Sequence, residues 1–138
     1  MTQEDRELLL KKDLCARFPY GVKLEVKYQE GAWMLFAIYY AWDKLYVIGD
    51  GGYPIESKFA DCKPYLFPIS NMTEEQKKEY NILCGDVPTY HYEFGDIVED
   101  TILYDNWESI DYLNAHHFDY RGLIEKELAI DATGLNIY

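Results

Sequence analysis

The change of hydrophobic period near residue 19 is the feature that most constrains the fold of this chain. Leu10, Leu14 and Phe18 recur at every fourth position, which is the spacing of one face of an α-helix. Pro19 then disfavours helix in the residue before it. From residue 22 to 28, apolar residues alternate with charged ones, which is typical of a half-buried strand. The pattern predicts an N-terminal helix over residues 1–19 and a β-rich part after it.

The β-rich part is predicted to extend over residues 20–69. Tight turns separate short runs of apolar, aromatic and β-branched residues. Pro54 lacks the amide that a ladder needs, so its run is expected to be an edge strand. The sequence predicts a small antiparallel sheet or an SH3-like barrel. The expected strands cover residues 22–28, 32–42, 45–48, 53–55 and 63–69.

Residues 70–138 are expected to be mainly helical. Thr73 and Gln76 form a capping box, which predicts a helix that begins at this point. Residues 89–104 alternate tyrosine with polar residues and are expected to be extended. The chain as a whole is predicted to be one α+β domain over residues 1–138.

Two further helices are predicted near the C-terminus. Asp105 or Asn106 can cap a helix that begins at Trp107. Asp119 can cap a fourth helix, with Leu123 on its inner face. Together these two helices would form a helix hairpin.

The charge of the chain is concentrated in its second half. Residues 1–70 hold ten acids and nine bases, and residues 71–138 hold fifteen acids and four bases, giving −1 and −11 of the total of −12. Nucleic-acid binders need the opposite sign to neutralise phosphates, so direct binding of DNA or RNA is disfavoured. A basic protein is the partner class that this charge favours.

Tyrosines interleaved with carboxylates from residue 90 to 120 suggest where such a partner would bind. The preferred hypothesis is a non-enzymatic interaction module whose acidic, tyrosine-rich surface includes Glu99, Asp100, Asp105 and Glu108. Mimicry of nucleic acid is a variant of this hypothesis. The alternative for the tyrosines is strand and core packing.

The string from His116 to Arg121 is the most unusual in the chain. One alternative function is a small-ligand or enzyme pocket lined by its polar side chains. Adjacent histidines on a helix diverge and chelate one ion poorly, so a metal site built with Asp119 or His91 is disfavoured. The structural alternative has one histidine packed, the other exposed, and Asp119 capping a helix. The pocket residues would be His116, His117, Asp119, Tyr120 and Arg121.

Several function classes lack their signatures. The chain has no Walker loop, GxGxxG or GxSxG motif, so no cofactor or catalytic residue is predicted. Cys15, Cys62 and Cys84 contain no CxxC pair and are expected to be small, buried free thiols in a reducing cytoplasm. A polar N-terminus and the lack of a long apolar run predict a cytoplasmic protein without membrane spans. Self-association through an aromatic sheet face is a third hypothesis, and the oligomeric state stays open.

Three strings carry a resemblance to a known family. They are residues 8–22, residues 63–75 and, most specifically, Leu113-Asn114-Ala115-His116-His117-Phe118-Asp119-Tyr120-Arg121-Gly122-Leu123-Ile124. Together they resemble a family of short proteins of gut bacteria of the Bacteroides group and their mobile elements. That family has no assigned activity, so the resemblance implies a bacterial cytoplasmic protein and transfers no role to any residue.

Overall fold

The N-terminal helix is present as predicted. The computed structural model describes residues 1–49, 51–84, 89–93, 96–100 and 107–138. Helix α1 (Gln3–Arg17) begins with a capping box between Thr2 and Asp5. A short 3-10 helix, η1 (Phe18–Tyr20), follows it, and Gly21 ends the turn with a φ of +70°. Phe18 was expected on the buried face, but it is 40% exposed, while Arg17 is fully buried.

An antiparallel sheet follows α1. Strand β4 lies at its edge, as Pro54 predicts, because the edge needs no amide there. A 3-10 turn, η2 (Tyr40–Trp42), joins the second and third strands, and another, η3 (Phe59–Asp61), joins the fourth and fifth. The strands are β1 (Lys23–Val26), β2 (Ala32–Tyr39), β3 (Lys44–Ile48), β4 (Pro54–Lys58) and β5 (Cys62–Pro68).

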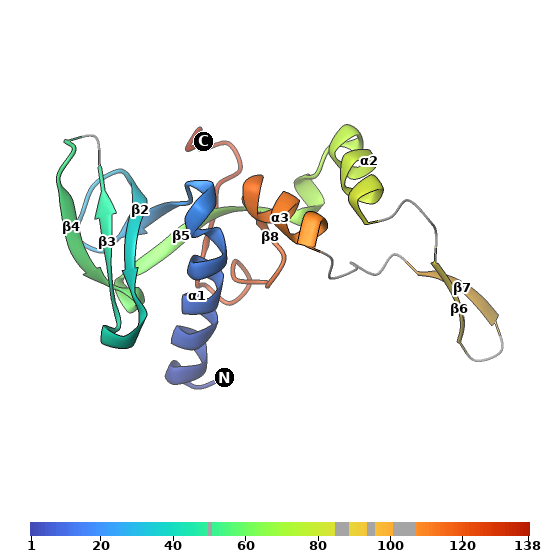
Figure 1. Cartoon of the computed structure of the whole chain (residues 1–138), viewed down its shortest axis with the longest axis horizontal. Helices are drawn as coiled ribbons and strands as arrows, with labels where there is room; N and C mark the ends of the chain where they lie inside the picture. Colours follow the sequence, from blue (N-terminus) through green and yellow to red (C-terminus); the bar gives the residue numbers. More distant parts are fainter. Residues whose placement is uncertain (50, 85–88, 94–95, 101–106) are drawn as a thin grey trace.

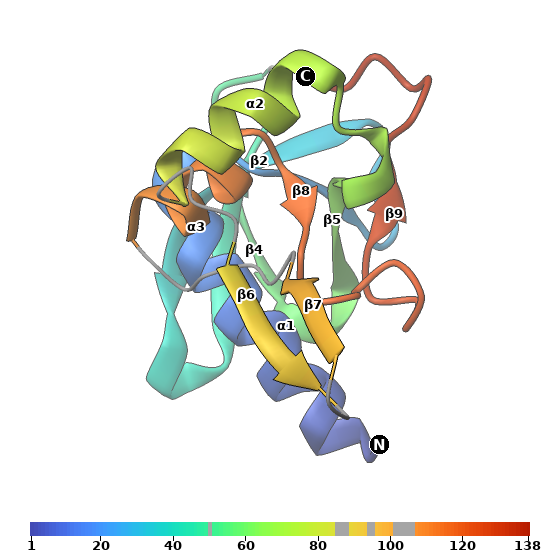
Figure 2. The ribbon, with the colours of Figure 1, turned by 90° about the vertical axis from the view of Figure 1, so that its right-hand side faces the viewer.

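The sheet is open, so the expectation of a closed SH3-like barrel is not confirmed. Its path runs β4-β3-β2-β1-β5-β8, and β4 and β8 (Phe118–Asp119) do not pair with each other. Strands β8 and β9 (Ile130–Asp131) both pair in parallel with β5. Figure 2 shows these two short strands on either side of β5. The sheet is therefore mixed, because β8 and β9 add parallel pairs to the antiparallel pairs of strands β1 to β5.

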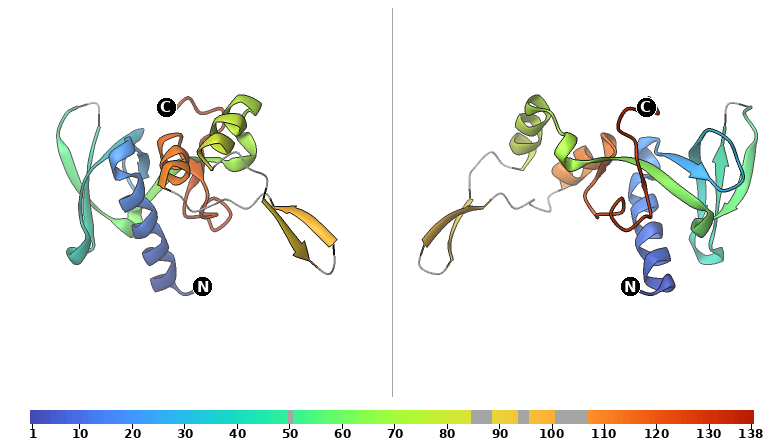
Figure 3. Two further views of the ribbon diagram at one scale, coloured as in Figure 1. Left: turned by 45° about the vertical axis from the view of Figure 1, so that its right-hand side comes forward. Right: turned by 180° about the vertical axis from the view of Figure 1, so that it is seen from behind.

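Helix α1 covers one face of the sheet. Leu10 and Leu14 of α1 pack with buried residues of β1, β3 and β5, among them Leu24, Val47 and Leu66. In both views of Figure 3, α1 lies between β2–β4 and helix α3 (Trp107–Ala115). A second cluster, which includes Tyr80, Leu113 and Phe118, joins helix α2 (Glu74–Leu83) and α3 to β8. The burial of these apolar side chains is the main favourable contribution to folding.

Helix α2 (Glu74–Leu83) begins with the predicted capping box of Thr73 and Gln76. Strands β6 (Thr89–Glu93) and β7 (Asp96–Asp100) pair as an antiparallel hairpin, within the stretch predicted to be extended (Figure 1). Helix α3 (Trp107–Ala115) is also as predicted. Its expected caps, Asp105 and Asn106, lie outside the described residues.

The predicted fourth helix and the helix hairpin are wrong. Within residues 107–138 the chain forms β8, a series of turns and β9 after α3. His117, Gly122 and Glu127 have φ values of +61°, +72° and +60°, which a right-handed helix does not accommodate. The description of residues 70–138 as mainly helical is also wrong, since α2 and α3 contain 10 and 9 residues.

Candidate functional site

The segment from His116 to Arg121 turns sharply at the end of α3. The positive φ of His117 ends the helix, and the carbonyl oxygen of His117 accepts a hydrogen bond from the amide of Phe67 at 2.8 Å. Phe118 then pairs with Phe67 in the sheet. This geometry separates the predicted pocket residues into two groups with different surroundings.

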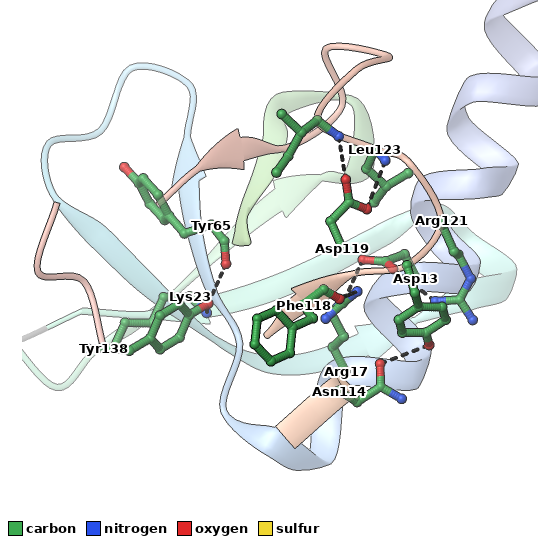
Figure 4. Close-up of polar contacts among 12 residues, drawn as sticks. Asp13, Arg17, Lys23, Tyr65, Asn114, Phe118, Asp119, Arg121, Leu123 and Tyr138 are labelled. Atoms are coloured by element: carbon green, nitrogen blue, oxygen red, sulfur yellow. Dashed lines mark hydrogen bonds and ion pairs between the residues drawn. The ribbon is translucent and has the colours of Figure 1, made fainter. Parts of the chain in front are cut away.

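Asp119 holds the turn that replaces the predicted helix. Its two carboxylate oxygens accept hydrogen bonds from the amides of Leu123 and Ile124, both at 2.9 Å. The residue therefore caps backbone amides, as one alternative expected, but they belong to a turn. Both acceptor oxygens are used in this structural role, which Figure 4 shows.

Tyr120 and Arg121 belong to a buried charged cluster with α1. Asp13 and Arg17 are fully buried, and the Asp13 carboxylate lies 2.8 Å from Nε of Arg17 and 2.9 Å from Nη1 of Arg121. The ring of Tyr120 lies under both guanidinium groups, at 5.1 and 4.6 Å. Its hydroxyl donates to Asn114 at 2.9 Å. These contacts (Figure 4) pair the buried carboxylate of Asp13 with two guanidinium groups, so Tyr120 and Arg121 have a structural role.

The two histidines line an open groove of about 490 Å³, which we call the His116–Tyr138 groove. His117 stacks on the ring of Tyr138 with centroids 3.6 Å apart and planes at 12°. His116 is exposed and lies 4.2 Å from the ring of Tyr112. The groove is lined by aromatic and uncharged polar side chains: Phe67, Asn71, Gln76, Ala115, His116, His117, Phe118 and Tyr138.

Tyr138 lines the groove and is anchored to the sheet. Its hydroxyl donates to the carbonyl oxygen of Tyr65 at 2.7 Å and accepts from the amide of Lys23 at 3.0 Å. Burial, helped by the nearby charges of Arg17 and Lys23, lowers the pKa of His117 from 6.5 to about 4. His117 is therefore neutral at pH 7.

Helix α2 supplies carboxylates near the groove, through Glu79 and Glu75. The hydroxyl of Tyr112 donates to Glu79 at 2.8 Å, and the ring of Tyr112 contacts His116. Burial and this hydrogen bond raise the pKa of Tyr112 to about 12, and Glu75 adds to the effect. Gln76, which lines the groove, lies one turn before Glu79 on the same helix. Two opposite charges therefore lie near the groove: the Nζ of Lys23, 5.9 Å from the ring centroid of Tyr138, and the Glu79 carboxylate bound to Tyr112.

The predicted acidic surface is only partly described. Glu108 is exposed on α3. Glu99 and Asp100 lie on β7, in register with Tyr90 and Thr89 of β6. Asp105 lies outside the described residues.

Neither metal ligation nor thiolate chemistry is supported in the described ranges. They contain no group of three or more His, Cys, Asp or Glu side chains that could hold a metal ion. Burial raises the pKa of Cys62 to about 11, and its thiol lies 3.4 Å from the Ser57 hydroxyl. Cys15 is exposed, so the expectation of buried thiols is wrong for it, and Cys84 is half-buried.

No family model, curated protein or solved structure matches the chain. The resemblance to the Bacteroides-group family therefore stays a prediction. No helix of the described part is long and apolar enough to cross a membrane.

Six of the eight groove residues were missed by sequence reasoning, two of them, Ala115 and Phe118, next to the predicted histidines. Phe67, Asn71 and Gln76 lie about forty or more residues before the histidines, and Tyr138 is the last residue. Gln76 was identified only as part of a capping box. The parallel pairing of β5 with β8, which nothing in the local pattern indicates, brings these residues together.

Proposed function

We propose that this protein is a non-enzymatic binding module for a basic polypeptide segment. The segment would bind in the His116–Tyr138 groove and along the exposed carboxylates of α2 and α3. The observation that carries the proposal is the link from the groove through Tyr112 to Glu79, because it places a carboxylate beside a tyrosine ring that contacts exposed His116.

An arginine side chain fits this combination of groups. Its planar guanidinium stacks on aromatic rings and forms paired hydrogen bonds with a carboxylate. Exposed His116 supplies a ring and Glu79 supplies the carboxylate. Since the positive charge of Lys23 lies near Tyr138 and would repel a guanidinium, the arginine is expected to bind beside α2.

The exposed faces of α2 and α3 would extend the attraction. Among the acidic residues of these two helices, Glu74 forms an ion pair with Lys77, and this pair is exposed to solvent. Long-range attraction of this kind raises the association rate and weakens as salt screens it. The exposed carboxylates are Glu74, Glu75, Glu79, Glu108 and Asp111.

A salt-dependent binding experiment tests the function. An arginine-rich peptide labelled with a fluorophore would be titrated with the protein at low and at physiological salt. We expect Glu75→Gln with Glu79→Gln to weaken binding about tenfold, or ~1.4 kcal/mol. The amide of glutamine still accepts from the Tyr112 hydroxyl, so the fold is retained.

The matched control changes the same charge elsewhere. Glu4→Gln with Glu30→Gln alters two exposed carboxylates far from α2 in the sequence. We expect this pair to change the affinity less than about twofold at physiological salt. Equal weakening by the two double variants would show that net charge, and not the groove, attracts the peptide, and would overturn the proposal.

A further inference from the structure

A small cavity, which we call the α1–β5 cavity, is lined by residues of α1, β5 and the turn at Leu128. Its volume is about 190 Å³, less than half that of the His116–Tyr138 groove. Leu10 and Cys62, which are 2% and 1% exposed, form its apolar part together with half-buried Leu128. Pockets for drug-sized ligands measure about 300–1,000 Å³, so this cavity suits a smaller molecule.

Four charged side chains also line the α1–β5 cavity, two of each sign. Arg6 and Glu7 come from α1, Lys63 from β5 and Glu127 from the turn before β9. Within the described part of the chain, Arg6, Lys63 and Glu127 form no ion pair and no side-chain hydrogen bond. Glu7 accepts one hydrogen bond, from Gln3 at 3.4 Å. The charges of the lining therefore balance in number, but they are not paired with one another.

Glu127 occupies a backbone position that favours glycine. Its φ is +60°, its amide donates to the carbonyl oxygen of Ile124 at 3.1 Å, and the amide of Leu128 donates to that of Leu123 at 2.9 Å. These two hydrogen bonds form a Schellman turn, in which the residue of positive φ is usually glycine. A side chain there costs conformational energy, and the turn does not use the carboxylate. This strain is a reason to look for a role of the Glu127 carboxylate in the cavity.

We propose that the α1–β5 cavity binds a zwitterion, namely a free α-amino acid with a small aliphatic side chain. A ligand with a single charge would meet a side chain of like charge in this cavity, whereas a zwitterion pairs with both signs. Its carboxylate would bind Arg6 and Lys63, and its ammonium group would bind Glu127. Its aliphatic side chain would pack on Leu10 and Leu128.

Titration with L-leucine, followed by NMR of the backbone amides, tests the class of ligand. We expect saturable shifts at Leu10, Cys62 and Leu128, with a Kd of about 1 mM or lower. Leucinamide lacks the carboxylate and isocaproate lacks the ammonium group, so each should bind at least about tenfold more weakly. Binding of either analogue as tightly as leucine would overturn the proposal, and so would the absence of saturable shifts.

Matched variants test the role of Glu127. We expect Glu127→Gln to weaken the binding of leucine about tenfold. Glu127→Gly should weaken it equally with no loss of melting temperature, because glycine accommodates the positive φ. Glu125→Gln is the control, since Glu125 is exposed nearby and does not line the cavity, and it should change the affinity less than about twofold.

Equal weakening by Glu125→Gln and Glu127→Gln would overturn the proposal, because net charge alone would then explain the binding. None of these outcomes bears on the salt-dependent binding at α2. The α1–β5 cavity and the His116–Tyr138 groove share no lining residue.

Discussion

The Asp13 carboxylate lies 2.8 Å from Nε of Arg17, and neither side chain is exposed to water. Arg17 also donates from Nη2 to the carbonyl oxygen of Phe118 at 2.6 Å. Arg121 binds the second oxygen of Asp13. One buried ion pair on α1 therefore holds the start of the turn-rich C-terminal segment against the helix.

Neutralising Asp13 should strongly destabilise the fold. Asp13→Asn keeps the shape of the side chain but leaves the buried charge of Arg17 without its partner. Removal of one member of a buried pair costs about 3–5 kcal/mol. Chemical denaturation of the variant and of the unmodified protein measures this difference.

The control for Asp13 is an exposed ion pair. Glu56 lies 3.6 Å from Lys44 and its side chain is 54% exposed. Glu56→Gln should change the free energy of unfolding by less than about 1 kcal/mol. A cost for Asp13→Asn no larger than that for Glu56→Gln would contradict the structural role of the buried pair.

Loss of the Asp119 carboxylate should loosen the turn after β8. Asp119→Ala leaves the amides of Leu123 and Ile124 without acceptors, and we expect a cost of about 1–2 kcal/mol. Faster hydrogen exchange at these two amides would identify the cause. Asp131→Ala, in an exposed turn where Asp131 accepts from the amide of Thr133, should cost less. Unchanged exchange at both amides would refute the capping role.

The neutral state of His117 should make stability depend on pH. The unfolded chain takes up a proton near the ordinary pKa of 6.5, whereas the folded chain does so only near pH 4. The contribution of His117 to stability is therefore complete above about pH 6.5 and is lost as the pH falls towards about 4. His117→Phe should remove this part of the pH dependence, which denaturation at several pH values measures. An imidazole that titrates near its ordinary pKa by NMR would rule this out.

A methyl group at Gly49 should disturb the packing of Trp33. An added Cβ would lie 2.9 Å from Cζ3 of that ring, whereas a Cβ at Gly51 meets no atom within 4 Å. We expect Gly49→Ala to cost about 1–3 kcal/mol and Gly51→Ala to be nearly neutral. Thermal unfolding of both variants compares them, and equal melting temperatures would contradict the close contact.

Several helices and strands follow from local sequence patterns alone. The capping box of Thr73 and Gln76 predicted where a helix begins, and Pro54 predicted an edge strand. These features depend on neighbours within a few residues, so a local sequence pattern is enough to predict them. For the same reason the prediction of helix α3 was confirmed.

The course of the chain after α3 depends on long-range contacts. The local pattern around Leu123 is compatible with a helix, but parallel pairing with β5 at both Phe118 and Ile130 requires turns between them. Arg17 follows an apolar helix face in the sequence, and in the structure it is buried with its Nε bound to Asp13 and its Nη2 bound to the carbonyl oxygen of Phe118. Phe118 lies 101 residues away in the chain, and no local pattern contains a contact of that range. The same long-range pairing opens the sheet and brings Phe67 to the histidines, so the groove exists only in the folded chain.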